Sequence, residues 1–378
     1  MKKFANRKTA LWTALALSAV VSGSAFADGS NVTIYGTLDA GIVSVTNQAN
    51  PAGGTASVTA LNTGGLSPSI LGFKGTEDLG GGLKANFNLE EHLFATTGAG
   101  GQWGGLFGRQ ANVGLSNNLG SIVLGKQYSP AVLAFAATDP RGLKETFSGL
   151  ISWALTQNPL NGGAATAPGN SNSVIDVFLA NAISLSTKVG DVSLSGAYSL
   201  GEVAGNTSAN TVLSLGAVYN GPVTLSAAYQ KDNGSTAAAS GTQVEKYSFG
   251  AGYSFGDATV KGSYLNDKNT NAATGTELQN YQILSAGVDY RTAANNVATL
   301  AYYHSKNKDM TADTSNTWIL SDEYSLSKRT TLYALVSGVN TGANYSSGAA
   351  FGVANNNTYL GAQGKNTTAL ELGVRHTF

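Results

Sequence analysis

Short stretches in which apolar and polar residues alternate recur along the whole chain. In the last of them Leu370, Leu372, Val374 and Phe378 share one parity, and Glu371 lies on the other. Since the side chains of a strand point alternately to its two faces, this segment predicts a strand with one apolar face and one polar face. Chain ends usually fray, so a patterned strand that reaches the last residue suggests a terminus built into a sheet.

The same pattern predicts about sixteen strands, joined alternately by short turns and by longer polar connections. This arrangement is typical of a bacterial outer-membrane barrel, whose short turns face the periplasm. A soluble β-sandwich also has many short strands but does not require the alternation. We therefore expect an all-β fold, a transmembrane antiparallel β-barrel. The predicted strands cover residues 31–45, 69–76, 83–94, 107–116, 121–128, 173–187, 191–200, 211–219, 223–231, 244–255, 258–267, 278–290, 296–306, 317–326, 330–339 and 366–378.

Two connections are long at the start of this pattern. Residues 46–67 are rich in Asn, Gly and Thr, and we expect a polar loop there. Residues 129–172 also lack a strand pattern, but they carry apolar runs at 131–135 and 150–155. Loops longer than about 15 residues are usually functional or disordered, and apolar runs would be costly in water. We expect this segment to fold inward along the barrel wall as a constriction loop; the alternative is an external lid packed on other loops.

The N-terminus has the pattern of a secretion signal. Basic residues within 2–8 precede an apolar run over 9–21, and Ala25 and Ala27 form an Ala-x-Ala cleavage site. The apolar run is too short to span a bilayer comfortably, which takes about 20 residues. We expect residues 1–27 to be a cleaved signal peptide and residues 28–378 to form the barrel.

Composition narrows the possible functions. The chain holds 22 basic and 22 acidic residues, and four of the basic ones fall in the signal segment, so the mature chain carries 18 against 22, a net charge of −4. This balance argues against nucleic-acid binding. The absence of cysteine excludes a disulfide framework and thiolate metal sites. Only three histidines are present, without ligand-like spacing, so we expect no metal and no cofactor.

No catalytic constellation is evident. Glu90, Glu91 and His92 suggest acid–base chemistry, but alternation puts Glu90 and His92 on one face and Glu91 on the other. Polar residues in a wet lumen explain them better. No nucleophile elbow or phosphate-binding glycine loop occurs in the right context, so we do not expect an enzyme.

Several stretches resemble the Gram-negative general porins, the trimeric sixteen-stranded barrels of the outer membrane. They lie at both ends of the mature chain and in its first third, whereas the middle matches only in its rhythm of strands and loops. Together they are specific, although each alone is not. The matching stretches are residues 32–41, 71–80, 107–115, 124–128 and 373–378.

The resemblance implies a homotrimer of water-filled channels for passive diffusion of small hydrophilic solutes and ions. It also implies contact with outer-membrane lipid and lipopolysaccharide, and recognition of the terminal Phe378 by the barrel-assembly machinery as the last strand closes the barrel. A substrate-specific channel for a sugar or an organic anion is the alternative function. An outer-membrane enzyme or an adhesin is a third possibility, but an adhesin needs no open lumen.

The resemblance also suggests which residues form the pore constriction. Lys74 and Arg109 match basic residues of the barrel wall, and Lys126 stands where the family often has arginine. On the inward loop, Asp139, Arg141 and Glu145 are the residues expected at the constriction. A transverse field between an acidic loop and a basic wall would set ion preference. The alternative is that these charges form structural ion pairs only.

The basic wall is thinner than in the family pattern. Ile70 replaces the arginine that usually precedes the Leu-Gly-Phe-Lys stretch, and residues 170–176 lack the usual arginines. We therefore expect a weaker anion preference than in strongly anion-selective members. Asn112 occupies a position that is usually apolar, and no physical reason for it is evident.

Overall fold

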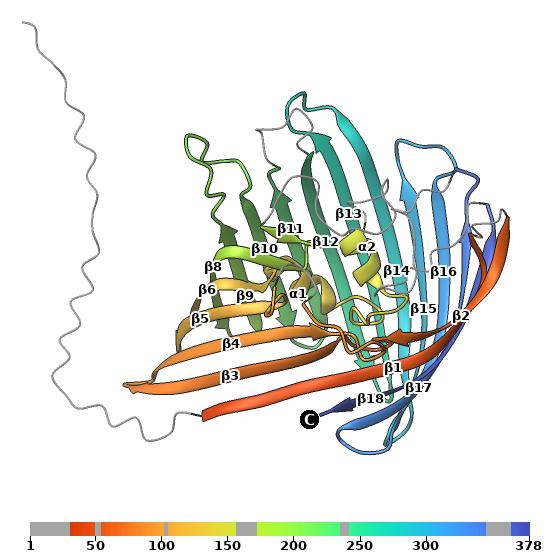
Figure 1. Cartoon of the computed structure of the whole chain (residues 1–378), viewed down its shortest axis with the longest axis horizontal. Helices are drawn as coiled ribbons and strands as arrows, with labels where there is room; N and C mark the ends of the chain where they lie inside the picture. Colours follow the sequence, from red (N-terminus) through yellow and green to blue (C-terminus); the bar gives the residue numbers. More distant parts are fainter. Residues whose placement is uncertain (1–30, 50–53, 102–104, 156–171, 235–241, 345–363) are drawn as a thin grey trace, which may run out of the picture.

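The chain forms a closed antiparallel barrel with a folded segment inside it (Figure 1). The computed structural model describes residues 31–49, 54–101, 105–155, 172–234, 242–344 and 364–378, and the expected signal peptide, residues 1–27, lies outside this range. The strands are β1 (Asn31–Ala49), β2 (Thr55–Thr63), β3 (Ser69–Gly80), β4 (Leu83–Leu93), β5 (Gln110–Asn117), β6 (Gly120–Tyr128), β7 (Ser173–Val174), β8 (Phe178–Val189), β9 (Val192–Ser199), β10 (Val212–Asn220), β11 (Thr224–Asp232), β12 (Thr242–Phe255), β13 (Ala258–Asn271), β14 (Glu277–Ala293), β15 (Asn296–Asn307), β16 (Thr314–Ser325), β17 (Thr330–Thr341) and β18 (Asn366–Thr377); the helices are α1 (Pro130–Ala136) and α2 (Gly149–Leu155).

These strands form a sixteen-stranded wall, as the alternation predicts. Strands β2 and β3 both pair with β1, at Ala40↔Thr63 and Thr37↔Ile70, so they act as one wall strand interrupted at residues 64–68. The two-residue β7 pairs only with the start of β8. The other strands each pair with their neighbours in sequence order, with β6 next to β8.

The first and last strands of the described residues pair with each other and close the barrel. Strand β18 pairs with β1 from Thr37↔Thr377 to Val45↔Ala369. Gly36 and Phe378 then exchange two backbone hydrogen bonds of 3.1 Å. A Cβ on Gly36 would come within 2.4 Å of the Phe378 ring, so only glycine leaves room for it. Closure removes the sheet edges, which a sheet in lipid requires.

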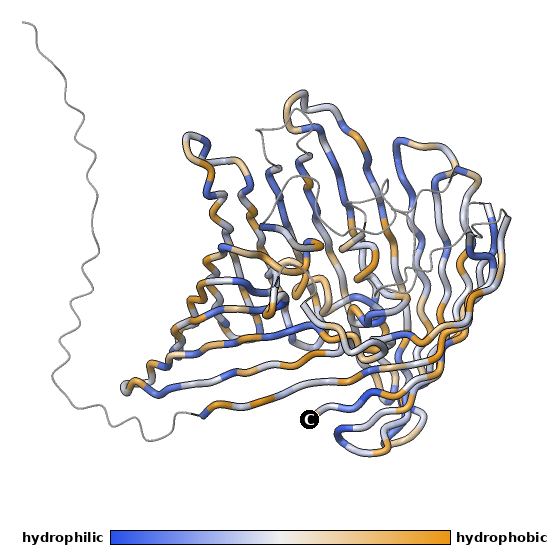
Figure 2. The backbone as a smooth tube through the Cα atoms, in the orientation of Figure 1, coloured by the Kyte–Doolittle hydropathy of each residue, from blue (hydrophilic) through white to orange (hydrophobic). Residues whose placement is uncertain are grey.

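Hydrophilic and hydrophobic residues alternate along the strands of the wall (Figure 2), and the two faces differ in exposure as this alternation predicts. On β18, Leu370, Leu372 and Val374 are 51%, 54% and 42% exposed, whereas Glu371 on the opposite face is fully buried. The same exposed apolar parity continues across the register into neighbouring strands, as at Leu38 and Ile42 of β1. Exposed apolar residues therefore cover the outer surface, and polar residues face inward.

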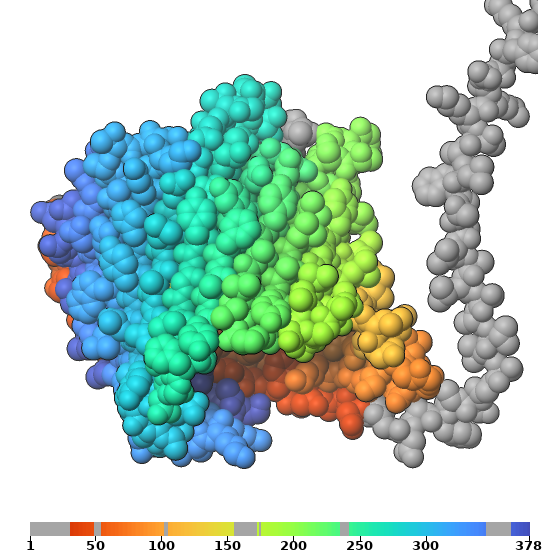
Figure 3. Space-filling model, turned by 180° about the vertical axis from the view of Figure 1, so that it is seen from behind, coloured from red at the N-terminus to blue at the C-terminus, as the bar shows by residue number. Residues whose placement is uncertain are grey.

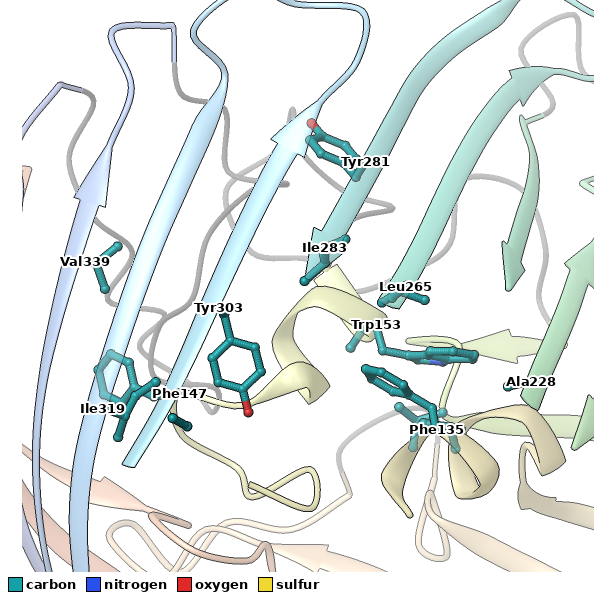
Figure 4. Packing of buried hydrophobic residues seen from close by; sticks show 14 of the residues in the cluster. Phe135, Phe147, Trp153, Ala228, Leu265, Tyr281, Ile283, Tyr303, Ile319 and Val339 are labelled. Atoms are coloured by element: carbon teal, nitrogen blue, oxygen red, sulfur yellow. The ribbon is translucent and has the colours of Figure 1, made fainter. Parts of the chain in front are cut away.

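The buried apolar core lies between the wall and the inward segment. The rings of Phe135 and Trp153, from α1 and α2, stack with centroids 5.3 Å apart (Figure 4). Phe147 of the same segment belongs to this core, together with Tyr303 and Ile319 of the facing wall. None of the helices in the described residues is long and apolar enough to cross a membrane.

Several expected element bounds are wrong by a few residues, as at the ends of β1, β3 and β13, and three differences concern how a segment is assigned. Residues 55–63, expected within a polar loop, form β2, because they continue the pairing of β1 after the interruption at 64–68. The strand expected from residue 173 begins at Phe178, so residues 173–177 belong to the inward segment. The strand expected from residue 107 begins at Gln110.

Candidate functional site

The segment between β6 and β8, residues 129–177, lies inside the barrel in its described parts, 129–155 and 172–177 (Figure 1). Ser129 caps α1, and Pro130 occupies the first turn, where a missing N–H is harmless. The Ser129 hydroxyl donates to Gln230 Oε1 at 2.6 Å, and the Ala131 N–H donates to Ser214 Oγ at 2.9 Å. Both partners belong to the inward-facing parity of β10 and β11, so α1 rests against the inner wall.

The middle of this segment reaches a different part of the wall. Arg141 Nη1 donates to Ser321 Oγ at 2.7 Å, and Lys144 forms an ion pair with Glu323; both partners are on β16. The Thr146 hydroxyl donates to the Gly65 carbonyl at 2.8 Å. The segment therefore crosses the interior, from β10 and β11 to β16 and the interruption between β2 and β3.

That interruption is built around Asp39. The Asp39 carboxylate accepts the N–H groups of Gly65, Leu66 and Ser67 at 2.9–3.1 Å and the hydroxyl of Tyr333 at 2.7 Å. A buried carboxylate is stable only when donors satisfy its oxygens. The hydrogen bonds to Asp39 therefore stabilise the break in the wall strand. The break leaves the Gly65 carbonyl free to accept a hydrogen bond from the inward segment.

Asp139 organises the inward segment itself. Its carboxylate accepts the N–H groups of Arg141 at 3.1 Å, Leu143 at 2.9 Å and Gly149 at 3.1 Å, and the Tyr303 hydroxyl at 3.2 Å. The side chain is fully buried. Burial raises the pKa of the Asp139 carboxyl above its usual value, while these hydrogen bonds oppose the rise. The structure places Asp139 inside the fold of the segment and not at a water-facing surface.

The end of the segment is held by a buried lysine of the wall. Lys246 Nζ of β12 lies 2.5 Å from Asp176 Oδ2 and 3.1 Å from Asp267 Oδ2, and it also donates to the Trp153 carbonyl. The Trp153 indole N–H donates to the Asp176 carbonyl at 3.0 Å. Gln230 Nε2 donates to the same carbonyl at 3.5 Å. One patch of inner wall therefore holds both ends of the inward segment.

A second cluster involves β1, β3, β4 and Arg109, which directly precedes β5. Arg109 Nε is 2.7 Å from Glu90 Oε1, and the guanidinium lies 4.9 Å from the Phe178 ring centroid. Glu90 Oε2 accepts the Tyr35 hydroxyl at 2.8 Å, and Lys74 Nζ lies 4.9 Å from the Tyr35 ring centroid. Arg109 is 4% exposed, whereas Lys74 is an exposed residue. The structure thus joins Lys74 and Arg109 through Tyr35 and Glu90.

The charged residues of the inward segment contact two different parts of the wall. Glu145 interacts electrostatically with Arg109, so the structure brings these two expected site residues together. Asp139 and Arg141 lie toward β15 and β16 instead. Glu145 and Arg141 are nearly buried, at 8% and 2% exposure.

Lys126 occupies a different position in the register of the wall. The register pairs Lys126 with Ala111, on the parity that carries the exposed Val113 and Leu124, at 56% and 48% exposure. The charge of Glu91, also on this parity, acts on Lys126. Contrary to the expectation from the sequence, this register does not place Lys126 on the pore wall.

Sequence reasoning missed Lys246, Asp176 and Asp267. No local motif marks them, because they are distant in sequence: the register of β12 and β13 brings Lys246 to Asp267, and the inward segment brings Asp176 to Lys246. The sequence marks Glu90 only as a candidate acid. Its inward parity was the available signal, shared with His92 through the pairs Gly72↔Glu90 and Ile70↔His92.

A family of known proteins accounts for this architecture. The family model described as Gram-negative porin matches residues 12–343. The chain belongs to the Gram-negative porin family. Among relatives of this porin, outer membrane porin protein 32 of Delftia acidovorans is 29% identical over 369 residues, which cover 96% of this chain and 99% of the relative. An outer membrane porin protein of Bordetella pertussis is 38% identical over 146 residues, 36% of this chain and 37% of the relative.

Solved structures agree with this assignment. The anion-selective porin from Comamonas acidovorans superposes with a TM-score of 0.76 at 25% identity, covering 93% of this chain and 100% of that one. OmpT of Vibrio cholerae in a trimer form has a TM-score of 0.65 at 14% identity, covering 93% and 100%, and shows the shared fold. This porin is therefore a barrel of the Gram-negative outer membrane that forms a channel.

Proposed function

We propose that this porin passes small hydrophilic solutes and ions by passive diffusion and that residues 129–177 set the aperture of its pore. The observation that carries the proposal is the attachment of this segment to separate parts of the inner wall. Its contacts at Gln230, Gly65 and Ser321 come from β11, from the β2–β3 interruption and from β16. A segment tied across the lumen excludes large solutes by its own volume.

The charges beside this segment support a modest anion preference. In the described part of the chain Lys74 is exposed and forms no salt bridge, so it adds an uncompensated positive charge to the wall. Glu90 compensates the charge of Arg109, and Ile70 replaces a further base. Rings of fixed charge set selectivity in pores. We therefore expect chloride to be favoured over potassium, but less strongly than in an anion-selective relative with a full set of bases.

Planar-bilayer recording tests the function. We expect large ohmic conductance steps, in groups of three if this porin forms a homotrimer like the trimeric form of its structural neighbour. Reversal potentials in a salt gradient test the ion preference, and a strong chloride selectivity would contradict the modest preference. Saturable block by one sugar or organic anion would favour a substrate-specific channel instead.

The proposal extends to export and assembly. Cleavage after Ala27 would release the mature chain, and the assembly machinery would read the strand that ends at Phe378. We also propose contacts with outer-membrane lipid and lipopolysaccharide. N-terminal sequencing of the protein purified from outer membranes tests the cleavage site.

A further inference from the structure

Tyr333 lies along the inner wall at the seam where the barrel closes. It pairs in register with Gly373 of β18, and Gly373 pairs with Gly41 of β1, so the three residues form one row across β17, β18 and β1. A Cβ on Gly373 would come within 2.2 Å of the Tyr333 ring, and a Cβ on Gly41 within 3.0 Å of its hydroxyl. The ring therefore has room only because both neighbours are glycine. Figure 3 shows the outer surface, where parts of β1, in red, adjoin the last strands, in dark blue.

The hydroxyl end of Tyr333 reaches the interruption at residues 64–68. The hydroxyl donates to Asp39 Oδ1 at 2.7 Å, and the same oxygen accepts the Gly65 N–H at 3.1 Å. A Cβ on Gly65 would come within 2.2 Å of the Tyr333 hydroxyl, so the two are in close contact. Tyr333 is 5% exposed and Asp39 is fully buried. Because a buried carboxylate needs donors for its oxygens, the hydroxyl helps to hold the interruption in its observed shape.

A second side chain crosses the seam beside Tyr333. Glu371 of β18 accepts the side-chain N–H of Asn62 at 2.8 Å. Asn62 belongs to β2 and pairs with Gly41, so this contact passes over β1. The interruption is thus held from the last two strands, in its middle by β17 and at the end of β2 by β18.

The interruption is also where residues 145–146, the tip of the inward segment, dock on the wall. The Gly65 carbonyl accepts the hydroxyl of Thr146 at 2.8 Å and its N–H at 3.3 Å, and the Leu66 carbonyl accepts the Glu145 N–H at 3.4 Å. Thr146 is fully buried. These hydrogen bonds all end on the backbone of the interruption, so the position of the tip follows the shape of the interruption.

Tyr333 can make these contacts only in the closed barrel. Strand β1 is the first strand of the wall, and β17 and β18 are the last, so they lie at opposite edges of an unclosed sheet. Pairing of β18 with β1 brings the Tyr333 hydroxyl to Asp39. Until then the Asp39 carboxylate lacks one of its donors, and the interruption lacks the ring that packs against Gly65.

We propose that Tyr333 is a positioning residue of the pore, which makes docking of the tip depend on closure of the barrel. The hydroxyl holds Asp39, Asp39 holds the interruption, and the interruption receives Thr146. The tip therefore takes its final position only after β18 has paired with β1. The effect of this coupling on conductance rests on the proposed aperture, whereas the docking itself is measured separately.

The reactivity of a thiol at Thr146 measures docking. The chain contains no cysteine, so Thr146→Cys introduces a single thiol, whose reaction with N-ethylmaleimide in the purified full-length mature protein reports opening of the tip. In this background we expect Tyr333→Phe to speed the reaction about tenfold, since a hydrogen bond to a charged group is lost and the ring is kept. Tyr302→Phe is the control, because it loses a hydrogen bond of 2.7 Å to Asn316 on the outer face. Equal rates in Tyr333→Phe and the control would overturn the proposal.

A second variant approaches the same contact from the other side. Gly65→Ala keeps the Tyr333 hydroxyl but places a Cβ where it lies, so we expect a faster reaction here too. Gly252→Ala is the control, because a Cβ there meets no atom closer than 3.4 Å. Since both changes act through one contact, Gly65→Ala/Tyr333→Phe should react more slowly than the product of the two single effects predicts. A full product would show that the two residues act independently and would contradict the proposal. Rates are compared only for protein with heat-resistant migration on gels, which excludes misfolded chains.

Single-channel recording separates this inference from the proposed aperture. If the inward segment sets the aperture, Tyr333→Phe should show larger current fluctuations together with its faster thiol reaction. A faster thiol reaction with unchanged current would support the role of Tyr333 and count against the proposed aperture. Larger fluctuations with an unchanged thiol reaction would show that Tyr333 acts on the current without moving the tip, and the inference would be wrong.

Discussion

At the scale of single residues, side chains inside this porin chiefly hold one another in place. Glu90 shows this best, because one of its oxygens binds Arg109 and the other accepts the Tyr35 hydroxyl, above which Lys74 lies. A fully formed buried network fixes the positions of its members. The positive charges of this wall are therefore fixed in position, and the Glu90 carboxylate lowers the net positive charge of the cluster.

Replacing that carboxylate should change ion preference. Glu90→Gln keeps an acceptor for Arg109 but removes the negative charge. A unit charge contributes about 1 kcal/mol to the energy of an ion about 4 Å away in water, so the permeability ratio should shift about fivefold toward chloride. Reversal potentials measure this shift. The exposed Glu77→Gln is the control, and an identical shift in both variants would show that Glu90 has no special position.

Asp139 makes stability depend on pH. Burial raises its pKa in the folded protein above the unfolded value, so between the two values the folded state binds more protons and the unfolding free energy falls as pH rises. We therefore expect the unaltered protein to lose stability relative to Asp139→Asn between pH 4 and pH 8. Thermal unfolding at both pH values tests this, with the exposed Asp257→Asn as control. A difference that grows in the opposite direction would contradict the sign.

At the scale of elements, the inward segment depends on its anchors more than on its own helices. Helices α1 and α2 have seven residues each, too short to be stable alone. Lys246 joins the end of α2 to Asp176 and to the wall. The segment and the wall strands thus form one packed unit.

Removing this anchor should loosen the pore without unfolding the barrel. Breaking a buried ion pair from one side costs about 3–5 kcal/mol, and in Lys246→Met this cost falls on the docking of α2. We expect larger current fluctuations and a higher mean conductance, while heat-resistant migration on gels stays normal. Lys246→Arg keeps the charge and serves as the control. Quiet, unchanged channels in Lys246→Met would show that the segment is held elsewhere.

Much of the wall is predictable from the sequence because strand periodicity is local. Parity alone places Lys126 outside, since it shares the parity of Ile122 and Leu124, whereas its position in the family pattern suggests the pore wall. The structural role of Asp139 and the cluster around Lys246 could not be predicted from the sequence. They depend on contacts between distant segments, such as Asp139 with Tyr303, that no local pattern encodes.

At the scale of the whole molecule, the barrel exists only when its first and last strands meet. Deleting Phe378 removes both of its hydrogen bonds with Gly36 and the ring that covers this glycine. We expect a several-fold lower yield of inserted protein, with unchanged conductance in the channels that do form. Outer-membrane yield and single-channel recording measure the two effects. Phe378→Tyr keeps the ring and is the control; normal yield after deletion would refute the role.

The double attachment at Gln230 has a consequence for how such channels diversify. Its amide contacts Ser129 at the start of the inward segment and the Asp176 carbonyl near its end. The segment is therefore a loop whose two ends are attached to the same side chain of the wall. The entropic cost of a longer flexible loop rises only with the logarithm of its length. Insertions between the two tied ends can therefore retune the aperture over evolutionary time and leave every barrel strand in register.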